Sequence, residues 1–382
     1  MEFEPYAARL AAVSVHPASR WAGAVAAVPR HVFVPHWWAP VAGGWELRDG
    51  PSDPPKWMEA AYENRTLVTR VGSLHADHAT AGDEPSGYPT SSSTLPGLVV
   101  TMLRHAMVPN DSQVLCVTGT GYTTAVLCSR LGEQNVTSVD VDPYLVQSAE
   151  TRLASVGLHP HMAVCDITGA LPGMYDRIVS TVSVSTIPVS WLAALKPGGR
   201  LVTTISNTGL IITADKTDDG GAVGKVEWDR AGFMATRHGD DYPDTGTSER
   251  FAEIRDQEGD EITTGRYPVL QVQEAWDVWS MLSVTCPGIA HRFETNGDER
   301  TAWMTHADGS WSRATAVRDA PPIVHQSGPQ RLWTELERIR RRLNLEGGLP
   351  IYGAKVTITP DGETTISRGG WSVTLTPTQK TA

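Results

Sequence analysis

Cysteine is scarce in this chain of 382 residues, and the four that occur stand far apart with no Cys-x-x-Cys pair among them. This spacing argues against a disulfide framework and against a cysteine-rich zinc site, and it fits a cytoplasmic protein with reduced thiols. No apolar run reaches the length of a membrane span, and the N-terminus lacks a basic start followed by an apolar core. We therefore expect a soluble protein that is neither exported nor inserted in a membrane.

An excess of positive charge is also missing, because 32 basic residues face 43 acidic ones and the net charge is −11. We therefore expect neither nucleic acid nor an anionic membrane as a partner. His75 and His78 have a spacing that could serve a metal ion, but they lie in a polar stretch without a third ligand, so no metal site is predicted. No serine stands in a nucleophile elbow, and no glycine-rich loop carries the lysine of a triphosphate site.

What the chain does contain, between residues 95 and 205, is an alternation of short apolar strands and helical patterns. The strands are expected at 114–117, 136–139, 162–165, 176–181 and 200–205, and the helices at 98–107, 122–131, 144–155 and 189–195. This order is typical of an α/β fold whose parallel sheet is covered on both faces. Right-handed crossovers then place the strand ends Val117, Asp140 and Asp166 along one edge of the sheet.

The regions on either side are less regular. We interpret residues 39–60 as a loop and residues 76–93 as an exposed, mobile polar segment, and later we expect an amphipathic helix at 331–345 and a hairpin at 355–375 with a Pro-Asp-Gly turn. The tryptophans of the later half, such as Trp279, fit core packing or the wall of a peptide groove. The expected division is an N-terminal helical and loop segment (1–94), a sheet domain (95–213) and an α+β C-terminal extension (214–382).

A possible cofactor site appears where the first strand turns into a helix, in QVLCVTGTGY (113–122). Two glycines in such a turn are weak evidence, since ordinary tight turns contain them too. About twenty residues later Asp140 ends a strand, where an acid accepts both ribose hydroxyls, and Asp166 follows the next strand, where it could hold an adenine amino group. Each acid alone is better explained as a helix cap. Together, in this order, the three features favour a cofactor that contains a nucleoside.

Four further segments complete a resemblance to the protein-L-isoaspartate O-methyltransferases: AVPRHVFVP (27–35), AYENRTLV (61–68), TSSSTLPGLVVTML (90–103) and YDRIVSTVSVSTIP (175–188). The resemblance covers about residues 20–210 and implies a Rossmann-like, S-adenosylmethionine-dependent methyltransferase fold. The cofactor-binding residues that it implies are Thr118, Gly119, Thr120, Gly121, Tyr122, Asp140, Val141, Asp166 and Ile167. The resemblance further implies that Thr94, two residues before Pro96, orients the acceptor carboxylate, with Ser93 as its reserve.

The chain departs from the family pattern at the glycine loop, which is one residue short and has Cys116 in place of an acid that helps to hold the methionine end of the cofactor. The loss of one charge-assisted hydrogen bond predicts an affinity lower by ~1–2 kcal/mol. Gly119 and Gly121 still allow the backbone to approach a ligand closely.

The C-terminal extension, about 170 residues, exceeds the ordinary repair enzyme of the family. Its segment DRAGFMATR (229–237) is similar to methyltransferases that accompany ATP-grasp ligases in maturing ribosomally made peptides of the graspetide type. This similarity implies a carboxyl O-methyltransferase that acts after such a ligase on an aspartyl or isoaspartyl side chain of a modified precursor peptide, giving a methyl ester and then an aspartimide. The alternatives are a general isoaspartate repair enzyme and a non-catalytic peptide-binding module with a methyltransferase fold.

Overall fold

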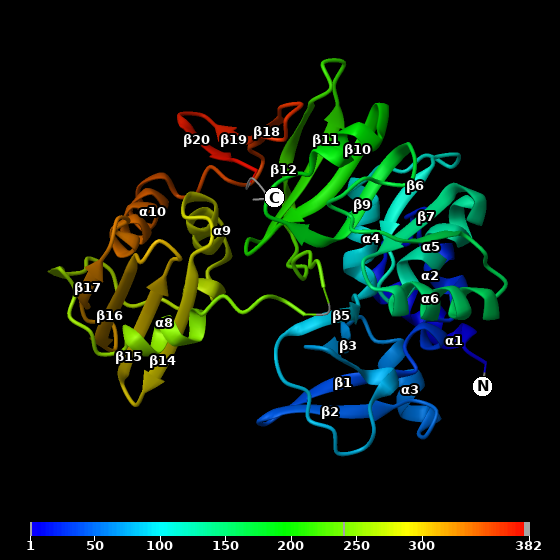
Figure 1. Cartoon of the computed structure of the whole chain (residues 1–382), viewed down its shortest axis with the longest axis horizontal. Coiled ribbons are helices and arrows are strands. Elements are labelled where there is room, and N and C mark those ends of the chain that lie inside the picture. The colour runs from blue at the N-terminus through cyan, green and yellow to red at the C-terminus, as the bar shows by residue number, and fades with distance from the viewer. Residues whose placement is uncertain (1, 240, 378–382) are drawn as a thin grey trace.

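A ten-stranded mixed sheet is the largest element of the computed structural model, which describes residues 2–239 and 241–377 (Figure 1). Five parallel strands form one half of it, namely β6 (Val114–Val117), β7 (Val136–Asp140), β8 (His161–Val164), β9 (Tyr175–Val184) and β10 (Leu195–Ile205). Their spatial order is β10-β9-β6-β7-β8, and each lies at or within a few residues of a predicted strand. The predicted α/β class and parallel sheet are therefore confirmed.

Helices cover both faces of this parallel half, as the sequence predicted. They are α4 (Pro96–His105), α5 (Tyr122–Leu131), α6 (Pro143–Ser155) and α7 (Val189–Ala194). The N-terminal helices α1 (Glu4–Ser14) and α2 (Ala22–Ala27) pack with α4 and α5 in one hydrophobic cluster, while α7 contributes to the cluster on the opposite face. None of the helices in the described ranges is long and apolar enough to cross a bilayer.

The other half of the sheet is antiparallel and comes from two distant parts of the chain. Its strands are β11 (Leu210–Lys216), β12 (Ala222–Arg230), β18 (Lys355–Ile358), β19 (Thr364–Arg368) and β20 (Trp371–Leu375). The expected hairpin at 355–375 is present as β18 and β19, but β18 also pairs with β12, with Ala222 opposite Ile358. The domain boundary expected between residues 213 and 214 falls inside β11, because a boundary chosen from local patterns cannot detect strand pairing across 130 residues of chain.

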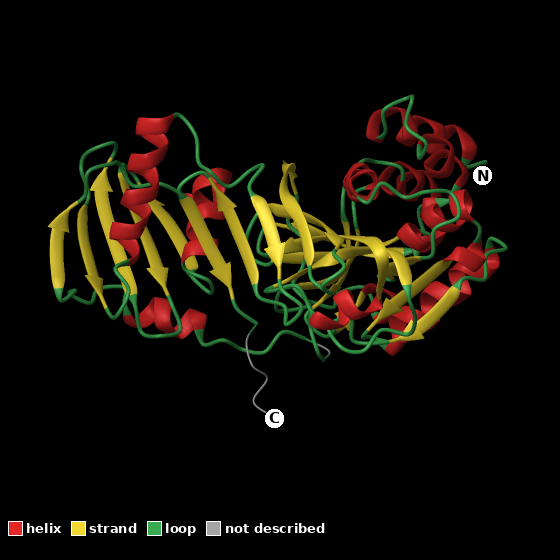
Figure 2. Ribbon diagram, turned by 90° about the horizontal axis from the view of Figure 1, so that it is seen from above, coloured by secondary structure: helices red, strands yellow, loops and turns green. Residues whose placement is uncertain are grey.

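The remainder of the C-terminal extension forms a separate lobe beside this sheet (Figures 1 and 2). It contains α8 (Thr247–Glu253), β13 (Glu261–Thr264), α9 (Trp276–Thr285), β14 (Ala290–Asn296), β15 (Glu299–Thr305), β16 (Trp311–Val317), β17 (Ile323–Ser327) and α10 (Leu332–Glu346). The five strands are antiparallel in the order β13-β17-β16-β15-β14, and α10 confirms the predicted amphipathic helix. Trp303 and Trp311 pack with Phe251 in a small core, whereas Trp276 and Trp279 are only half-buried.

Two expectations for the N-terminal region were wrong. Residues 39–60 are not a loop, since they contain most of the hairpin of β1 (His36–Val41) and β2 (Gly44–Asp49) and almost all of α3 (Pro54–Ala61). Their prolines and glycines mark the ends of elements; Asp53, for example, caps α3 directly before Pro54.

The polar segment 76–93 also contains ordered structure. It ends in β5 (Pro89–Ser93), which pairs antiparallel with β3 (Leu67–Val71). The short strand β4 (Leu74–His75), which directly precedes the segment, also pairs with β3. Hydroxyl groups hold the pair of β3 and β5: Thr69 Oγ1 donates to Ser91 Oγ at 3.2 Å, and Thr90 Oγ1 donates to the Gly72 carbonyl at 2.7 Å. A strand held by hydroxyls lacks the apolar alternation by which strands are recognised in a sequence.

The N-terminal segments meet the parallel half around Arg30, whose side chain is completely buried. Its guanidinium donates to the carbonyls of Ala61, Glu63 and Arg65 at 2.9 Å and to those of Ser93 and Thr94 at 3.3 Å. The group thus joins three segments that are far apart in sequence. Burial lowers its pKa to about 10, so the guanidinium remains charged at neutral pH.

Replacing Arg30 with methionine should lower the free energy of unfolding by ~3 kcal/mol, because several buried carbonyls would lose their donor. Denaturant unfolding measures the change, with Arg65→Met as the matched control, since the Arg65 side chain pairs with Glu63 in an exposed position. Equal midpoints for the two variants would contradict the structural role assigned to Arg30.

Candidate active site

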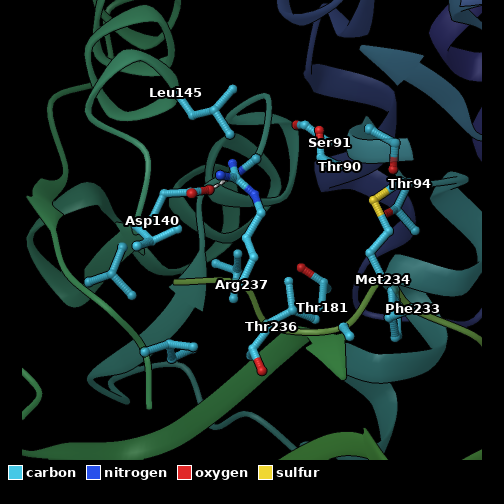
Figure 3. Close-up of a pocket in the computed structure, with 18 of the residues that line it drawn as sticks. Thr90, Ser91, Thr94, Asp140, Leu145, Thr181, Phe233, Met234, Thr236 and Arg237 are labelled. Atoms are coloured by element: carbon cyan, nitrogen blue, oxygen red, sulfur yellow. Dashed lines mark hydrogen bonds between the residues drawn. The ribbon is translucent and has the colours of Figure 1, made fainter. Parts of the chain in front are cut away.

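A cavity lies at the carboxyl ends of the parallel strands, between β5 and the segment that leaves β12 (Figure 3). The side facing β5 is lined by Thr66, Thr90, Ser91, Ser92, Thr94, Leu95 and Leu98. The side facing the strand ends is lined by Val117, Gly119, Val139, Asp140, Val141, Leu145, Cys165, Asp166, Ile167, Thr181 and Val182. Residues 232–237 complete the lining. The structure thus brings the predicted loop, strand ends and hydroxyl segment to one place.

The glycine loop presents backbone to the cavity and turns its larger side chains away from it. Gly119 has a φ of +49°, and an added Cβ there would approach only the Ser92 carbonyl oxygen, at 3.5 Å. Gly121 has a φ of +90° and packs against α6, where a Cβ would lie 3.1 Å from Ala149. Both positions therefore favour glycine, but only Gly119 borders the cavity.

Three of the predicted cofactor residues, Thr118, Thr120 and Tyr122, are buried outside the cavity lining. The Thr118 hydroxyl lies 2.8 Å from the Ser138 hydroxyl inside the sheet domain, and the Tyr122 ring lies beside the Arg30 guanidinium. The structure thus places these three predicted residues behind the cavity lining, and the Thr118 hydroxyl bonds within the core.

Cys116, which stands in place of the family's loop acid, is also buried outside the lining. Its Sγ lies 3.7 Å from Thr124 Oγ1, and burial raises the pKa of the thiol to about 11. This side chain therefore contributes nothing directly to the cavity wall.

Asp140 ends β7 inside the cavity and is almost completely buried. Its Oδ2 accepts from the Gly119 N–H at 3.0 Å and its Oδ1 from the Asp142 N–H at 3.2 Å. Burial raises the pKa of Asp140 to about 6, although these two hydrogen bonds and the charge of Arg237 oppose the rise. The carboxyl group therefore changes its charge close to physiological pH.

Asp166 follows β8 at the same edge and is more exposed. Its Oδ1 accepts from the Thr168 N–H and hydroxyl at 2.8 and 2.7 Å, and His238 Nδ1 lies 2.7 Å from its Oδ2. Partial burial opposes ionisation, but these contacts together hold its pKa below the usual range. Val141 and Ile167, the residues after the two acids, supply apolar wall next to them.

The predicted acceptor residues Thr94 and Ser93 face different ways. Thr94 lines the cavity, and within the described part of the chain its hydroxyl makes no hydrogen bond, so it is free to donate to a ligand. The Ser93 hydroxyl is buried outside the lining, 3.4 Å from the Arg30 guanidinium. Ser92 and Thr181 also line the cavity, although sequence reasoning did not single them out. For Thr181 the available signal was its place at the end of the predicted strand at 176–181, whereas Ser92 had no such signal.

Sequence reasoning also missed the strap, as we call residues 231–239, which crosses the ends of the strands after β12. Its backbone pairs with β9: the Ser183 N–H donates to the Met234 carbonyl at 2.8 Å, and the Thr236 N–H donates to the Ser183 carbonyl at 2.9 Å. Figure 3 shows Met234 near Thr94 and Arg237 near Asp140. The strap therefore spans the cavity from the acceptor hydroxyl to the two acids.

Comparison with known proteins matches residues 78–233 to the family model described as protein-L-isoaspartate(D-aspartate) O-methyltransferase (PCMT). A protein-L-isoaspartate O-methyltransferase of Azorhizobium caulinodans is 40% identical over 116 residues, which are 29% of this chain and 52% of that protein. The protein-L-isoaspartate O-methyltransferase 1 of Archaeoglobus fulgidus is 27% identical over 217 residues, which are 55% of this chain and 82% of that protein.

The chain thus spans about half the length of several curated relatives, with 52% of the Azorhizobium protein, 40% of the Thermotoga maritima protein and 57% of the Pyrococcus abyssi protein. A solved protein-L-isoaspartate O-methyltransferase aligns with 96% of this chain and 99% of its own, with a TM-score of 0.52 and 19% identity. That likeness concerns the fold, and it reaches into the C-terminal extension.

The buried Asp140 should make stability depend on pH in a defined direction. Because its pKa is higher in the folded state than in the unfolded state, folding binds a proton between about pH 4 and 6, and stability is lost as the pH rises through this window. An Asp140→Asn variant has no carboxyl group to titrate and lacks this loss. The free energy of unfolding of the variant minus that of the native protein should therefore be ~2 kcal/mol larger at pH 7.5 than at pH 4.5. Urea unfolding of both proteins at the two pH values tests this, and parallel pH profiles would contradict it.

Proposed function

We propose that the protein is an S-adenosylmethionine-dependent carboxyl O-methyltransferase acting on aspartyl or isoaspartyl side chains, because residues 78–233 match the model of the protein-L-isoaspartate(D-aspartate) O-methyltransferase family. The observation that carries the proposal is one cavity that contains both strand-end acids and the free Thr94 hydroxyl. Nucleoside-binding groups and an acceptor-binding group therefore lie within reach of a single ligand pair.

The residues present fit the proposed cofactor. Asp140 would accept hydrogen bonds from the ribose hydroxyls, and Asp166 would accept one from the adenine amino group. Val141 and Ile167 would contact the faces of the adenine ring. Gly119 leaves room for close approach to the backbone. With Cys116 turned into the core, the amino end of the cofactor would be held without the loop acid, which supports the expectation of reduced affinity.

When bound, S-adenosylmethionine supplies an electrophilic methyl group on a sulfonium. The acceptor carboxylate is ionised at neutral pH, since the pKa of an aspartyl side chain is about 4, so the protein needs no general base. Its task is to align the acceptor and to exclude water. The Thr94 hydroxyl would donate to one carboxylate oxygen and leave the other to attack, while Leu95 and Met234 supply apolar wall around it.

For the substrate class we propose a modified, ribosomally made precursor peptide, on which the enzyme acts after an ATP-grasp ligase. The support is the similarity of the strap sequence to methyltransferases of such systems, together with the position of Phe233 and Met234 in the cavity lining. After methylation, the nitrogen of the following backbone amide attacks the ester carbonyl and expels methoxide, which leaves as methanol with the amide proton. The product of this intramolecular step is an aspartimide.

General isoaspartate repair is the second candidate, and one observation favours it. The fold of a solved protein-L-isoaspartate O-methyltransferase aligns with this chain along almost its whole length, including the C-terminal lobe. A third possibility, a peptide-binding module without catalysis, requires that the cavity does not bind the cofactor. Titration with S-adenosylhomocysteine distinguishes this module from both enzymes.

Thr94→Ala should lower turnover by a factor of about ten, the equivalent of one lost hydrogen bond of ~1.4 kcal/mol to a charged group, and should change S-adenosylhomocysteine affinity little. Thr94→Ser should retain most of the activity because it keeps the hydroxyl. Ser93→Ala is the matched control, since Ser93 lies outside the lining, and its turnover should stay near that of the native protein. Steady-state kinetics and calorimetry test this, and an equal loss of cofactor affinity in Thr94→Ala would refute the assignment.

The substrate proposal predicts two successive mass changes in a ring-bearing precursor peptide, namely the gain of one methyl group and then the loss of methanol. A constrained ring holds the backbone nitrogen near the ester carbonyl, and well-oriented intramolecular reactions reach effective molarities of ~10⁵ M or more. Mass spectrometry of cyclised and linear precursors, with simple isoaspartyl peptides alongside, measures the preference. Methylation of the isoaspartyl peptides alone would favour repair.

A further inference from the structure

We propose that Arg237 of the strap is a positioning residue for the cofactor, which acts through Asp142 to orient the ribose-binding carboxylate of Asp140 and to hold it ionised. This inference rests on the proposed function, because it assigns the ribose hydroxyls to Asp140. It concerns a residue more than ninety positions away from the acids that it serves.

The geometry begins with Asp142, the residue that caps α6. Its Oδ1 accepts from the Tyr144 N–H at 2.9 Å, and its Oδ2 lies 3.3 Å from Arg237 Nη2 and also contacts Arg70 Nη1. The Asp142 N–H in turn donates to Asp140 Oδ1. Two arginines from different parts of the chain therefore fix the turn whose backbone holds the ribose acid.

Arg237 is suited to this position because its side chain is almost completely buried and yet lines the cavity. Its Nη1 donates to the Gly239 carbonyl and its Nη2 contacts Asp142. The backbone of the strap is in turn hydrogen-bonded to Ser183 of β9, so the position of the guanidinium is fixed. A planar guanidinium with five donors can bind Asp142 and still face a ligand in the cavity. Figure 3 shows it beside Asp140.

Arg237 supplies positive charge where burial opposes the ionisation of Asp140. Asp142 of the β7–α6 turn disfavours ionisation of Asp140, and burial disfavours it more strongly, whereas the Arg237 charge lowers the pKa of Asp140. Arg70 of β3 neutralises Asp142 from the other side, and at the neighbouring strand end Asp166 is paired with His238. Removing the Arg237 charge would take away one of the two guanidinium groups that contact Asp142 and would favour the protonated form of Asp140.

The test is the pH dependence of S-adenosylhomocysteine affinity, measured by calorimetry between pH 5 and 8. Native protein should lose affinity as the pH falls through about 6, because protonated Asp140 accepts fewer hydrogen bonds. In Arg237→Met, which keeps an apolar stem, the midpoint should move up by about one pH unit. Arg237→Lys keeps the charge and should keep the native midpoint.

A purely structural role of Arg237 predicts something else, namely a loss of affinity by the same factor at every pH with an unchanged midpoint, and this result would overturn the inference. Arg237→Gln is the second neutral variant in case Arg237→Met does not fold. Absence of S-adenosylhomocysteine binding by the native protein would instead refute the proposed function. In that case the role of Arg237 can still be decided without ligand. The pH dependence of the free energy of unfolding is measured for native protein and for Arg237→Met, each compared with the same protein carrying Asp140→Asn, and the difference gives the titration midpoint of Asp140.

Discussion

A buried guanidinium determines where the acceptor side of the cavity lies. Arg30 binds the main chain of the segment after α3 and of the segment that joins β5 to α4, and the second of these carries Thr94. The Thr94 hydroxyl, which would orient a substrate, is therefore positioned by the hydrogen bonds of the Arg30 guanidinium to the backbone of these two segments. This explains why the motifs at 27–35, 61–68 and 90–103 occur together, although the first of them does not line the cavity.

On the opposite side of the cavity, buried arginines again hold the structure together, but the groups that they bind are carboxylates, whose burial lowers the free energy of unfolding. Here carboxylates are buried, and arginines from β3 and from the strap compensate them through Asp142. A carboxyl group with a pKa near 6 destabilises the folded protein at neutral pH, and a protein retains such a group where function requires it. Stability and ligand binding thus make opposite demands on Asp140.

The parallel half of the fold was predictable because each of its strands and helices carries a local pattern. The positions of Asp140 and Asp166 followed from the rule that parallel strands end at one edge. Side-chain direction within the glycine loop did not follow, since Thr118 and Thr120 have polar types but face the core. Strand β5 was missed because hydroxyl pairing replaces apolar alternation, and the pairing of β12 with β18 has no local signature at all.

That pairing has a consequence for the whole molecule. Because β12 and β18 are neighbours in the sheet, residues 231–354 form an insertion that leaves the sheet and returns to it at adjacent strands. The strap is the outgoing connection of this insertion, and it carries Arg237 to Asp142 and His238 to Asp166 before the chain enters the C-terminal lobe. The contacts of the strap with Asp142 and Asp166 therefore lie near the start of this insertion.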